Sequence, residues 1–290
     1  MYNVDNAIIM AAGTSSRFAP LSYEKPKALV KVKNEILIER QISQLKEAGI
    51  PKIYVITGYK AEQFQYLKAK FNIELIHNPN YLTHNNNSSI WAAQHVLKNT
   101  YVCSADNYFI INPFEKNVED SYYAAVFSEG PTPEWCLKTD DRDIITGVTI
   151  GGCHSWYMLG HTFWSEAFSH DFIRIMEKEY HFPQTANLLW ESIYAKHLDS
   201  LKMKIKRYPS NFIFEFDTLD ELRNFDTSYI TDSRSMIIKN ISHILKCNES
   251  ELESIEAYKD KNNVASGFHF KVGNLKYSYD YNTSKIIKRN

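Results

Sequence analysis

Residues 7–29 read AIIMAAGTSSRFAPLSYEKPKAL, and this stretch decides how the rest of the chain is interpreted. Residues 7–10 are apolar, and small residues follow at once at 11–13. An apolar run without helical periodicity that meets a glycine predicts a buried strand ending in a loop. An ordinary strand-to-helix connection is the simplest alternative for such a loop.

The composition of the loop favours a binding site for phosphate groups. Small side chains at Ala11, Ala12 and Gly13 let backbone N–H groups approach a ligand closely, and such groups form an anion cradle. Arg17 and Lys27 supply two fixed cations nearby in the chain, as the charge of a triphosphate requires. The stretch therefore predicts a nucleotide site.

The overall composition is that of a globular protein without a strong net field. The 290 residues are 44% hydrophobic, and 33 basic side chains nearly cancel 34 acidic ones. This balance favours neither nucleic acid nor an acidic membrane as a partner. The first apolar run is short and has no basic leader, so we expect no signal peptide, no membrane insertion and a cytoplasmic location.

The four cysteines have no paired spacing, which argues against a zinc knuckle or a disulfide framework. We expect all four to be buried thiols: Cys103, Cys136, Cys153 and Cys247.

Strand and helix patterns alternate at short intervals after the opening loop. The expected helices are 36–48, 61–71, one that starts near residue 90, 165–180, 186–196 and 218–225. The expected strands are 52–57, 73–76, 101–103, 122–127, 135–138, 156–159 and 212–216. Such alternation predicts an α/β sheet with parallel strands, whose ligands bind at the carboxyl ends of the strands.

Two aspartates follow short apolar strands. Asp106 comes after the strand at 101–103, which puts its carboxylate at the carboxyl end of a strand, on the edge that carries the phosphate loop. Asp217 ends the strand at 212–216. Asp217 is also a good N-cap for the following helix, in which case Asp220 shares the capping.

The string AAGTSSRFAPLSYEKPKAL resembles the signature of the nucleotidyltransferases that activate sugar phosphates and small alcohol phosphates. Within that family the chain is most similar to the bacterial phosphocholine cytidylyltransferases and their relatives that act on 2-aminoethylphosphonate, over residues 5–228. The resemblance implies a Rossmann-like, mixed but mostly parallel sheet flanked by helices. One departure is that Thr14, Ser15 and Ser16 stand where the family usually has more glycine.

The resemblance also assigns roles to residues. It implies Arg17, Lys27, Asp106 and Asp217 as the catalytic set, with Asp106 and Asp217 as ligands of Mg²⁺, an ion that needs few protein carboxylates beside phosphate oxygens and water. The residues implied in nucleotide binding are Ala11, Ala12, Gly13, Thr14, Ser15, Arg17, Lys27, Asn86, Ser88, Ser89 and Ala105. The run HNPNYLTHNNNSS at 77–89 would meet the cytosine base. A surface loop capped by Ser88 or Ser89 is the alternative.

The middle of the chain, about 122–206, is expected to hold the acceptor. Glu134, Trp135, Trp190 and Glu191 match or adjoin positions that line the acceptor pocket in the phosphocholine enzymes, although aromatic residues at such spacing are commonly core. The chain departs from those enzymes in having Ser88 and Leu189 where they carry tyrosines. Fewer rings weaken a cation–π cage for a quaternary ammonium, whereas a primary ammonium needs carboxylate or amide acceptors.

The predicted function is transfer of CMP from CTP to a small amine-bearing phosphonate or phosphate, with 2-aminoethylphosphonate as the first choice and phosphocholine or phosphoethanolamine as alternatives. A sugar-1-phosphate nucleotidyltransferase and a nucleotide-binding regulatory protein without turnover are further alternatives. We expect residues 1–230 to form the nucleotidyltransferase domain. Residues 231–290 resemble the start of a choline-kinase-like N-terminal lobe, too short to be a kinase, that packs on the enzyme or forms a homodimer.

Overall fold

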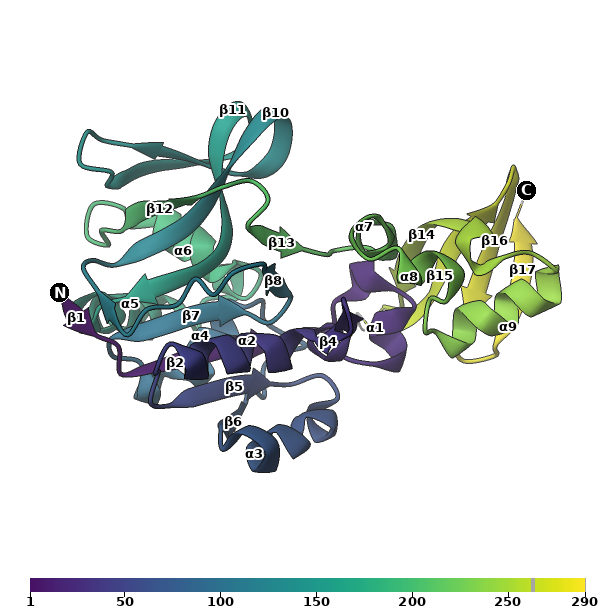
Figure 1. Ribbon diagram of the computed structural model, residues 1–290, viewed down its shortest axis with the longest axis horizontal. Helices are drawn as coiled ribbons and strands as arrows, with labels where there is room; N and C mark the ends of the chain where they lie inside the picture. The colour runs from purple at the N-terminus through teal and green to yellow at the C-terminus, as the bar shows by residue number, and fades with distance from the viewer. Residues whose placement is uncertain (262–263, 290) are drawn as a thin grey trace. The chain divides into compact units, whose positions relative to one another are not determined.

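The computed structural model describes residues 1–261 and 264–289 (Figure 1). The contacts between Cα atoms group the chain into two compact units. Unit 1 comprises Met1–Gly13 and Leu37–Glu215, and unit 2 comprises Thr14–Ile36 and Phe216–Asn290. Each unit therefore combines two stretches that are separated in the sequence. The domain boundary expected near residue 230 stays a prediction.

Unit 1 is built on a mixed, largely parallel sheet of seven strands in the order β12-β10-β11-β7-β2-β5-β6. The central pairs of β2 with β5 and with β7 are parallel, as are β5 with β6 and β10 with β12. Only β11 runs antiparallel to both of its neighbours within this sheet of described residues. The strands are β2 (Asn6–Ala11), β5 (Ile53–Thr57), β6 (Glu74–His77), β7 (Thr100–Ser104), β10 (Tyr122–Thr139), β11 (Ile145–Trp164) and β12 (Lys204–Tyr208).

Helices cover both faces of this sheet, with α2 on one face and α4, α5 and α6 on the other (Figure 1). The second face is the larger core, where Ile8 and Val102 of the central strands meet Trp164 and Phe172. The helices are α2 (Leu37–Glu47), α3 (Tyr66–Phe71), α4 (Asn87–Ala92), α5 (Glu166–Glu179) and α6 (Trp190–Lys196), with short 3₁₀ turns η3 (Ala61–Phe64), η4 (Gln94–Val96) and η5 (Pro183–Thr185). This layered arrangement confirms the α/β fold expected from the sequence.

Two small strand pairs complete unit 1. One joins β1 (Tyr2–Asn3) to β9 (Asn117–Val118). The other joins β8 (Asn107–Phe109) to β13 (Ile213–Glu215) in antiparallel register, with Glu215 opposite Asn107. The second pair brings the end of unit 1's chain beside the strand that follows Asp106.

Unit 2 combines the segment after the glycine loop with a C-terminal antiparallel sheet in the order β14-β15-β16-β17. The first stretch holds η1 (Ser16–Phe18), α1 (Leu21–Glu24), η2 (Lys27–Leu29), β3 (Lys31–Val32) and β4 (Glu35–Ile36). The second holds α7 (Leu219–Phe225), α8 (Ser228–Thr231), α9 (Met236–Leu245), η6 (Glu249–Glu251), β14 (Leu252–Lys259), β15 (Ala265–Val272), β16 (Leu275–Asp280) and β17 (Lys285–Arg289). Ile238 and Ile241 of α9 are buried, as are Phe268 and Phe270 of the sheet.

Most expected elements are confirmed, and the differences have local causes. The helix expected at 61–71 divides into η3 and α3 at Gln65. The strand pieces expected at 122–127 and 135–138 are one strand, β10, because bulges carry the chain past the prolines at 131 and 133. The helix expected at 186–196 begins only at Trp190, after η5.

All four cysteines in the described residues are free, as the spacing predicted. The expectation that all are buried is wrong, because Cys153 is exposed and Cys247 is partly exposed. Only Cys103 and Cys136 are buried, and burial raises the pKa of both thiols. None of the helices in residues 1–261 and 264–289 combines the length and the apolar character that crossing a bilayer requires.

Candidate active site

The loop after β2 is held in place by close backbone contacts within unit 1. Ala11 and Ala12 are buried at the end of the central strand. The Ala12 carbonyl accepts a hydrogen bond from the Tyr59 N–H at 3.0 Å. A Cβ atom at Gly58 would lie 2.9 Å from that carbonyl and 2.6 Å from the Tyr81 ring, so only glycine fits there. Gly58, which the sequence indicated only as a strand breaker, is therefore what lets a second chain segment support the loop.

Gly13 is in a different situation. It is exposed, and a Cβ atom built on it would meet no described atom within 4 Å. The backbone around Gly13 therefore borders open space, as a loop that admits a ligand requires.

Asp106 lies at the carboxyl end of β7, next to the end of β2. Parallel pairing sets Ser104 beside Met10, and the Ala105 N–H donates to the Met10 carbonyl at 3.2 Å. Ala105 is buried, whereas Asp106 is partly exposed. This confirms the expected position of Asp106 on the edge that carries the glycine loop.

The strand pair β8–β13 brings distant parts of the sequence together. Glu215 lies opposite Asn107, and the Asn107 side chain donates to the Glu215 carboxylate at 3.5 Å. Asp106 precedes Asn107 by one residue, and Asp217 follows Glu215 by two. Within unit 1 the pairing thus joins the residue after Asp106 to the end of the segment that precedes Asp217.

In unit 2 the two expected cations converge on Asp217. Arg17 Nη1 lies 2.7 Å from Asp217 Oδ2, and Lys27 Nζ lies 3.3 Å from Asp217 Oδ1. Lys27 is only 5% exposed, with its ammonium 5.8 Å from the centre of the Phe18 ring. Arg17 is 75% exposed and reaches the carboxylate from solvent. Three residues that the sequence assigned to catalysis are therefore in direct contact.

Asp217 does not cap the helix that follows it. The N-cap of α7 is Thr218, whose hydroxyl accepts from the Glu221 N–H at 3.2 Å, while the Glu221 carboxylate accepts from the Thr218 and Asp217 N–H groups. The capping interpretation of Asp217 and of Asp220 is wrong because this capping box satisfies the helix end. The Asp217 backbone is thereby fixed, and its carboxylate is available to the cations.

Ser15 accounts for one departure from the family's loop. It adopts a left-handed conformation with φ of 47°, a region that glycine populates without strain. At Ser15 the backbone thus has a conformation that favours glycine, the residue that is more common in this loop in the family.

Several asparagine and serine side chains of the run at 77–89 form hydrogen bonds inside unit 1. Asn78 is buried and donates to the hydroxyls of Ser88 at 2.8 Å and Ser89 at 3.3 Å. Ser88 and Ser89 lie inside α4, which begins at Asn87, so their proposed role as the helix cap is wrong. Asn78 was missed by the sequence reasoning, although it stands in the same polar run.

Asn86 links this run to the expected acceptor region. Its Nδ2 donates to Glu191 Oε2 at 3.0 Å, and its Oδ1 accepts from the Trp190 N–H at 2.7 Å. The Tyr123 hydroxyl donates to Glu191 Oε1 at 3.2 Å. Burial raises the pKa of the Glu191 carboxyl group to about 7, although the hydrogen bonds from Asn86 and Tyr123 act in the opposite direction. Tyr123 stands in an apolar strand and carries no motif, which is why the sequence did not single it out.

The two tryptophans of the expected acceptor set differ in environment. Trp190 is 1% exposed and stacks on Tyr123 with ring centroids 5.6 Å apart, so it belongs to the core. Trp135 is partly exposed and packs against the same core cluster. Glu134, its neighbour in β10, is exposed. The buried Trp190 therefore anchors the start of α6, which carries Glu191. Trp135 and Glu134, in contrast, have surface that is accessible to solvent.

The acidic residues present suit a hard cation that takes few protein ligands. Within the described residues no three His, Cys, Asp or Glu side chains gather into a site that could hold a metal by themselves. Mg²⁺ characteristically binds through one or two carboxylates and completes its shell with phosphate oxygens and water. The assignment of Asp106 and Asp217 as its ligands stays a prediction.

Comparison with known proteins identifies the family that the chain resembles. Residues 7–128 match the MobA-like NTP transferase domain. The choline-phosphate cytidylyltransferase of Streptococcus pneumoniae is 33% identical over 220 residues, which cover 76% of this chain and 96% of that protein. The 2-aminoethylphosphonate cytidylyltransferase of Lancefieldella rimae is 35% identical over 237 residues, covering 79% and 95%.

A solved structure gives the same result in three dimensions. The CTP:phosphocholine cytidylyltransferase of Streptococcus pneumoniae matches with a TM-score of 0.75 at 33% identity, over 78% of this chain and 99% of that one. The identity and the coverage are both too high for a resemblance of fold alone. The chain therefore belongs to the nucleotidyltransferase family that contains these cytidylyltransferases.

Proposed function

We propose that this protein is a cytidylyltransferase that transfers CMP from CTP to a small amine-bearing phosphonate or phosphate and releases pyrophosphate. The observation that carries the proposal is the cluster of Arg17, Lys27 and Asp217, in which two cations meet one carboxylate. A polyanion of four negative charges needs such fixed cations to bind.

The reaction is an in-line displacement. An oxygen of the acceptor's phosphonate or phosphate attacks the α-phosphorus of CTP, the bond to the bridging oxygen of the β-phosphate breaks, and pyrophosphate leaves with the electron pair. The second ionisation of a phosphomonoester lies near pH 6, so the nucleophile is already an oxyanion and needs no general base. The protein's task is to orient two polyanions and to stabilise the charge of the transition state.

Within this mechanism Lys27 and Arg17 hold the triphosphate and the charge that develops on pyrophosphate. Lys27 has little freedom to move because it is 5% exposed and lies beside Phe18. Preorganised charge of this kind lowers the barrier without a cost of reorientation during the reaction. The exposed Arg17 serves the outer phosphates, which enter from solvent.

Mg²⁺ fits the same proposal, with Asp106 and Asp217 as its protein ligands. The β8–β13 pairing supports this pair because it joins the chain one residue from Asp106 to the chain two residues from Asp217. When bound, the ion neutralises phosphate charge and polarises the phosphoryl group. Arg17 and Lys27 form ion pairs with the Asp217 carboxylate.

For the acceptor, 2-aminoethylphosphonate is the first choice, giving CMP-2-aminoethylphosphonate. Glu191 supports it, because carboxylate oxygens that accept hydrogen bonds from Asn86 and Tyr123 can also accept from a primary ammonium. A pKa near 7 makes Glu191 largely ionised at slightly alkaline pH.

Phosphocholine, which gives CDP-choline, is the second candidate. It is supported by the name of the pneumococcal relative and by the partly exposed ring of Trp135, since a quaternary ammonium binds through aromatic faces rather than hydrogen bonds. The two candidates differ at the amine end, a primary against a quaternary ammonium, and at the acidic end, a phosphonate against a phosphate ester.

The test is pyrophosphate release with Mg²⁺, each of the four NTPs, and a panel of 2-aminoethylphosphonate, phosphoethanolamine, phosphocholine and glucose 1-phosphate. We expect release with CTP and the amine acceptors, with the highest kcat/KM for 2-aminoethylphosphonate. A preference for phosphocholine selects the second candidate. Release with glucose 1-phosphate alone, or no release with any NTP, contradicts the proposal and favours a sugar nucleotidyltransferase or a regulatory protein.

A matched variant makes the acceptor test sharper. Glu191→Gln keeps the size of the side chain but removes its charge. If the ammonium of 2-aminoethylphosphonate binds Glu191, this variant should raise the acceptor KM by about tenfold, as loss of one charge-assisted hydrogen bond implies, without changing the KM for CTP. Equal KM values for both substrates in wild type and variant would remove Glu191 from the acceptor site.

A further inference from the structure

The C-terminal residues form one compact unit with the segment that carries Arg17 and Lys27. This unit combines Thr14–Ile36 with Phe216–Asn290, although all of Leu37–Glu215 separates them in the chain. The two relatives compared above are matched over 96% and 95% of their own length while covering 76% and 79% of this chain. About a fifth to a quarter of this chain therefore lies outside these two matches.

The chain just after Lys27 is bonded to the second stretch of unit 2. The Tyr229 hydroxyl donates to the Lys31 carbonyl at 2.6 Å, and Arg234 Nη1 donates to the same oxygen at 3.0 Å. The Lys33 N–H donates to the Asp226 carboxylate at 2.8 Å. Tyr229 is 1% exposed, so its hydrogen bond is shielded from water.

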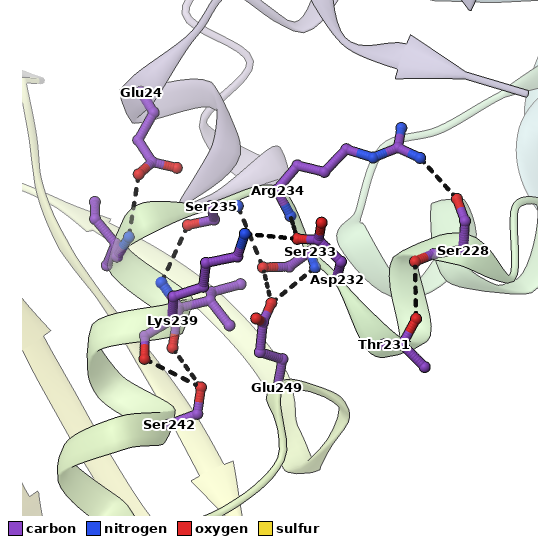
Figure 2. A network of polar contacts seen from close by, with 12 residues as sticks. Glu24, Ser228, Thr231, Asp232, Ser233, Arg234, Ser235, Lys239, Ser242 and Glu249 are labelled. Carbon is purple, nitrogen blue, oxygen red and sulfur yellow. Dashed lines mark hydrogen bonds and ion pairs between the residues drawn. The ribbon is translucent and has the colours of Figure 1, made fainter. Parts of the chain in front are cut away.

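The chain just before Lys27 is held as well. Glu24 Oε1 accepts from the Ile237 N–H at 3.1 Å, in the first turn of α9, where backbone N–H groups lack partners within the helix (Figure 2). The neighbouring Tyr23 ring stacks on Tyr281, which directly follows β16, with centroids 3.7 Å apart and planes within 6°. Contacts on both sides of Lys27 therefore come from the C-terminal module.

A polar network anchors these contacts to the rest of the module (Figure 2). The Arg234 N–H donates to Asp232, which forms an ion pair with Lys239 of α9 at 2.9 Å. The buried Ser233 donates through its N–H and its hydroxyl to the Glu249 carboxylate. Buried Arg223 of α7 donates to the Glu249 carbonyl at 2.7 Å. The residues that hold the Lys27 segment are thus themselves fixed between α7, α9 and η6.

We propose that residues 216–290 act as a positioning module that holds the Arg17–Lys27 segment in the conformation needed to bind the triphosphate. The inference rests on the proposed function for what Arg17 and Lys27 bind. Tyr229 and Glu24 are positioning residues, because each acts on Lys27 through the backbone on one side of it. In this role the module serves the nucleotide half of the reaction.

Kinetics of the full chain test this role. Tyr229→Phe keeps the ring and removes the hydrogen bond to the Lys31 carbonyl. Tyr258→Phe is the matched control, because it removes a hydrogen bond from a tyrosine hydroxyl to the Tyr279 carbonyl inside the same module. We expect Tyr229→Phe to raise the KM for CTP about fivefold, with the acceptor KM unchanged. Tyr258→Phe should leave both KM values at wild type.

A second pair of variants guards against a general loss of folding. Glu24→Ala removes the acceptor for the Ile237 N–H, whereas Glu24→Gln keeps an oxygen that accepts the same bond. We expect Glu24→Ala to raise the KM for CTP as Tyr229→Phe does, and Glu24→Gln to restore it. A fall in kcat alone, with both KM values unchanged, would indicate fewer folded molecules and would overturn the positioning role.

Amide hydrogen exchange gives a readout that does not depend on turnover. The Leu29 and Val30 N–H groups donate within η2, beside Lys27. In Tyr229→Phe and in Glu24→Ala we expect their exchange to quicken at least fivefold while the amides of β15 and β16 keep wild-type rates. Unchanged exchange at Leu29 and Val30 overturns the inference even if CTP is a substrate. A further outcome is that the wild type turns over no NTP while the two variants still show faster exchange only at Leu29 and Val30. That result supports the positioning contacts and contradicts only the proposed function.

Discussion

Lys27 is the residue on which the proposed chemistry most directly depends. It is nearly buried, it lies 3.3 Å from Asp217, and an ammonium preorganised beside a phosphate contributes about 3 kcal/mol to a transition state. We expect Lys27→Ala and Asp106→Ala each to lower kcat at least about a hundredfold while the fold survives. Pyrophosphate release measures this.

The matched control for that prediction is Lys25→Ala. Lys25 is exposed and stands two residues from Lys27 in the same segment. It should keep wild-type kcat, because it lies outside the cluster around Asp217. Near-normal turnover in Lys27→Ala or in Asp106→Ala would exclude that residue from the mechanism.

Glu191 has a pKa that folding raises into the neutral range, where its effect on stability can be measured. Its pKa rises from 4.5 to about 7 because burial disfavours the charged form. The folded state therefore binds this proton more tightly than the unfolded state does. The resulting stability is fully present below about pH 4.5 and is lost as the pH rises through 7.

This shift predicts a difference between wild type and Glu191→Gln. From pH 5 to pH 8 the free energy of unfolding of wild type should fall by about 2 to 3 kcal/mol relative to the variant, whose glutamine does not titrate. Urea unfolding at the two pH values measures the difference. Parallel pH profiles for the two proteins would show that the folded-state pKa of Glu191 is close to its unfolded value.

The sequence predicted the site membership of residues that carry a charge and stand within or beside a motif. Arg17, Lys27 and Asp217 were expected in one site and are in contact. Gly58 and Tyr123 could not be predicted, because their roles depend on the Ala12 carbonyl and on Glu191, which are distant in the chain. Local patterns report a residue's chemistry but not what the fold brings beside it.

At the scale of elements, the loop after β2 depends on two glycines for different reasons. A Cβ at Gly58 would collide with Tyr81 and with the Ala12 carbonyl, whereas a Cβ at Gly13 would meet open space in the described structure. Gly58→Ala should therefore lower the free energy of unfolding by about 1 to 3 kcal/mol, a typical cost of overpacking. Gly13→Ala should leave the free energy of unfolding unchanged.

The same pair separates folding from ligand binding. If the loop cradles the triphosphate, Gly13→Ala places a methyl group where the ligand approaches, so the Kd for CTP should rise at least about tenfold despite normal stability. Urea unfolding and titration calorimetry with CTP measure the two effects. A Gly13→Ala variant that binds CTP normally would show that the triphosphate does not pass close to this backbone.

Element boundaries were predicted well where apolar periodicity is strong and poorly where long strands contain turn residues. The helix expected at 36–48 is α2, with its start and end within a residue of the prediction. The sequence predicted two strands, 122–127 and 135–138, with a break around Gly130 and Pro131. In the structure, register shifts at bulges let β10 continue to Thr139. Pairing with β11 decides that outcome, and pairing between strands is not visible in one segment's composition.

At the scale of the whole molecule, the compact units do not follow the order of the chain. Residues 14–36 group with 216–290 through contacts such as those of Tyr229 and Arg234 with the Lys31 carbonyl. Neither side chain belongs to a motif, so this grouping could not be predicted from the sequence. The α/β class could be predicted because it depends on the alternation of elements, whereas the assembly of units depends on long-range contacts.

This grouping predicts how CTP should affect stability. A ligand that binds only the folded state raises the free energy of unfolding by about 2.7 kcal/mol at a concentration one hundred times its Kd. If Arg17, Lys27 and Asp217 bind the triphosphate and Mg²⁺, CTP with Mg²⁺ and no acceptor should raise the Tm of the protein. Thermal unfolding followed by circular dichroism and by exchange at Leu29 measures the shift.

Three controls show which part of the ligand is responsible. Lys27→Ala should lose most of the shift, because the buried ammonium no longer meets the phosphates, and EDTA should reduce it if Mg²⁺ bridges the carboxylates and the triphosphate. ATP at the same concentration should give a smaller shift if the run at 77–89 selects cytosine. An equal shift with ATP would show that the phosphates alone are recognised, and no shift with CTP in wild type would show that the cluster around Asp217 is a structural ion pair and not a nucleotide site.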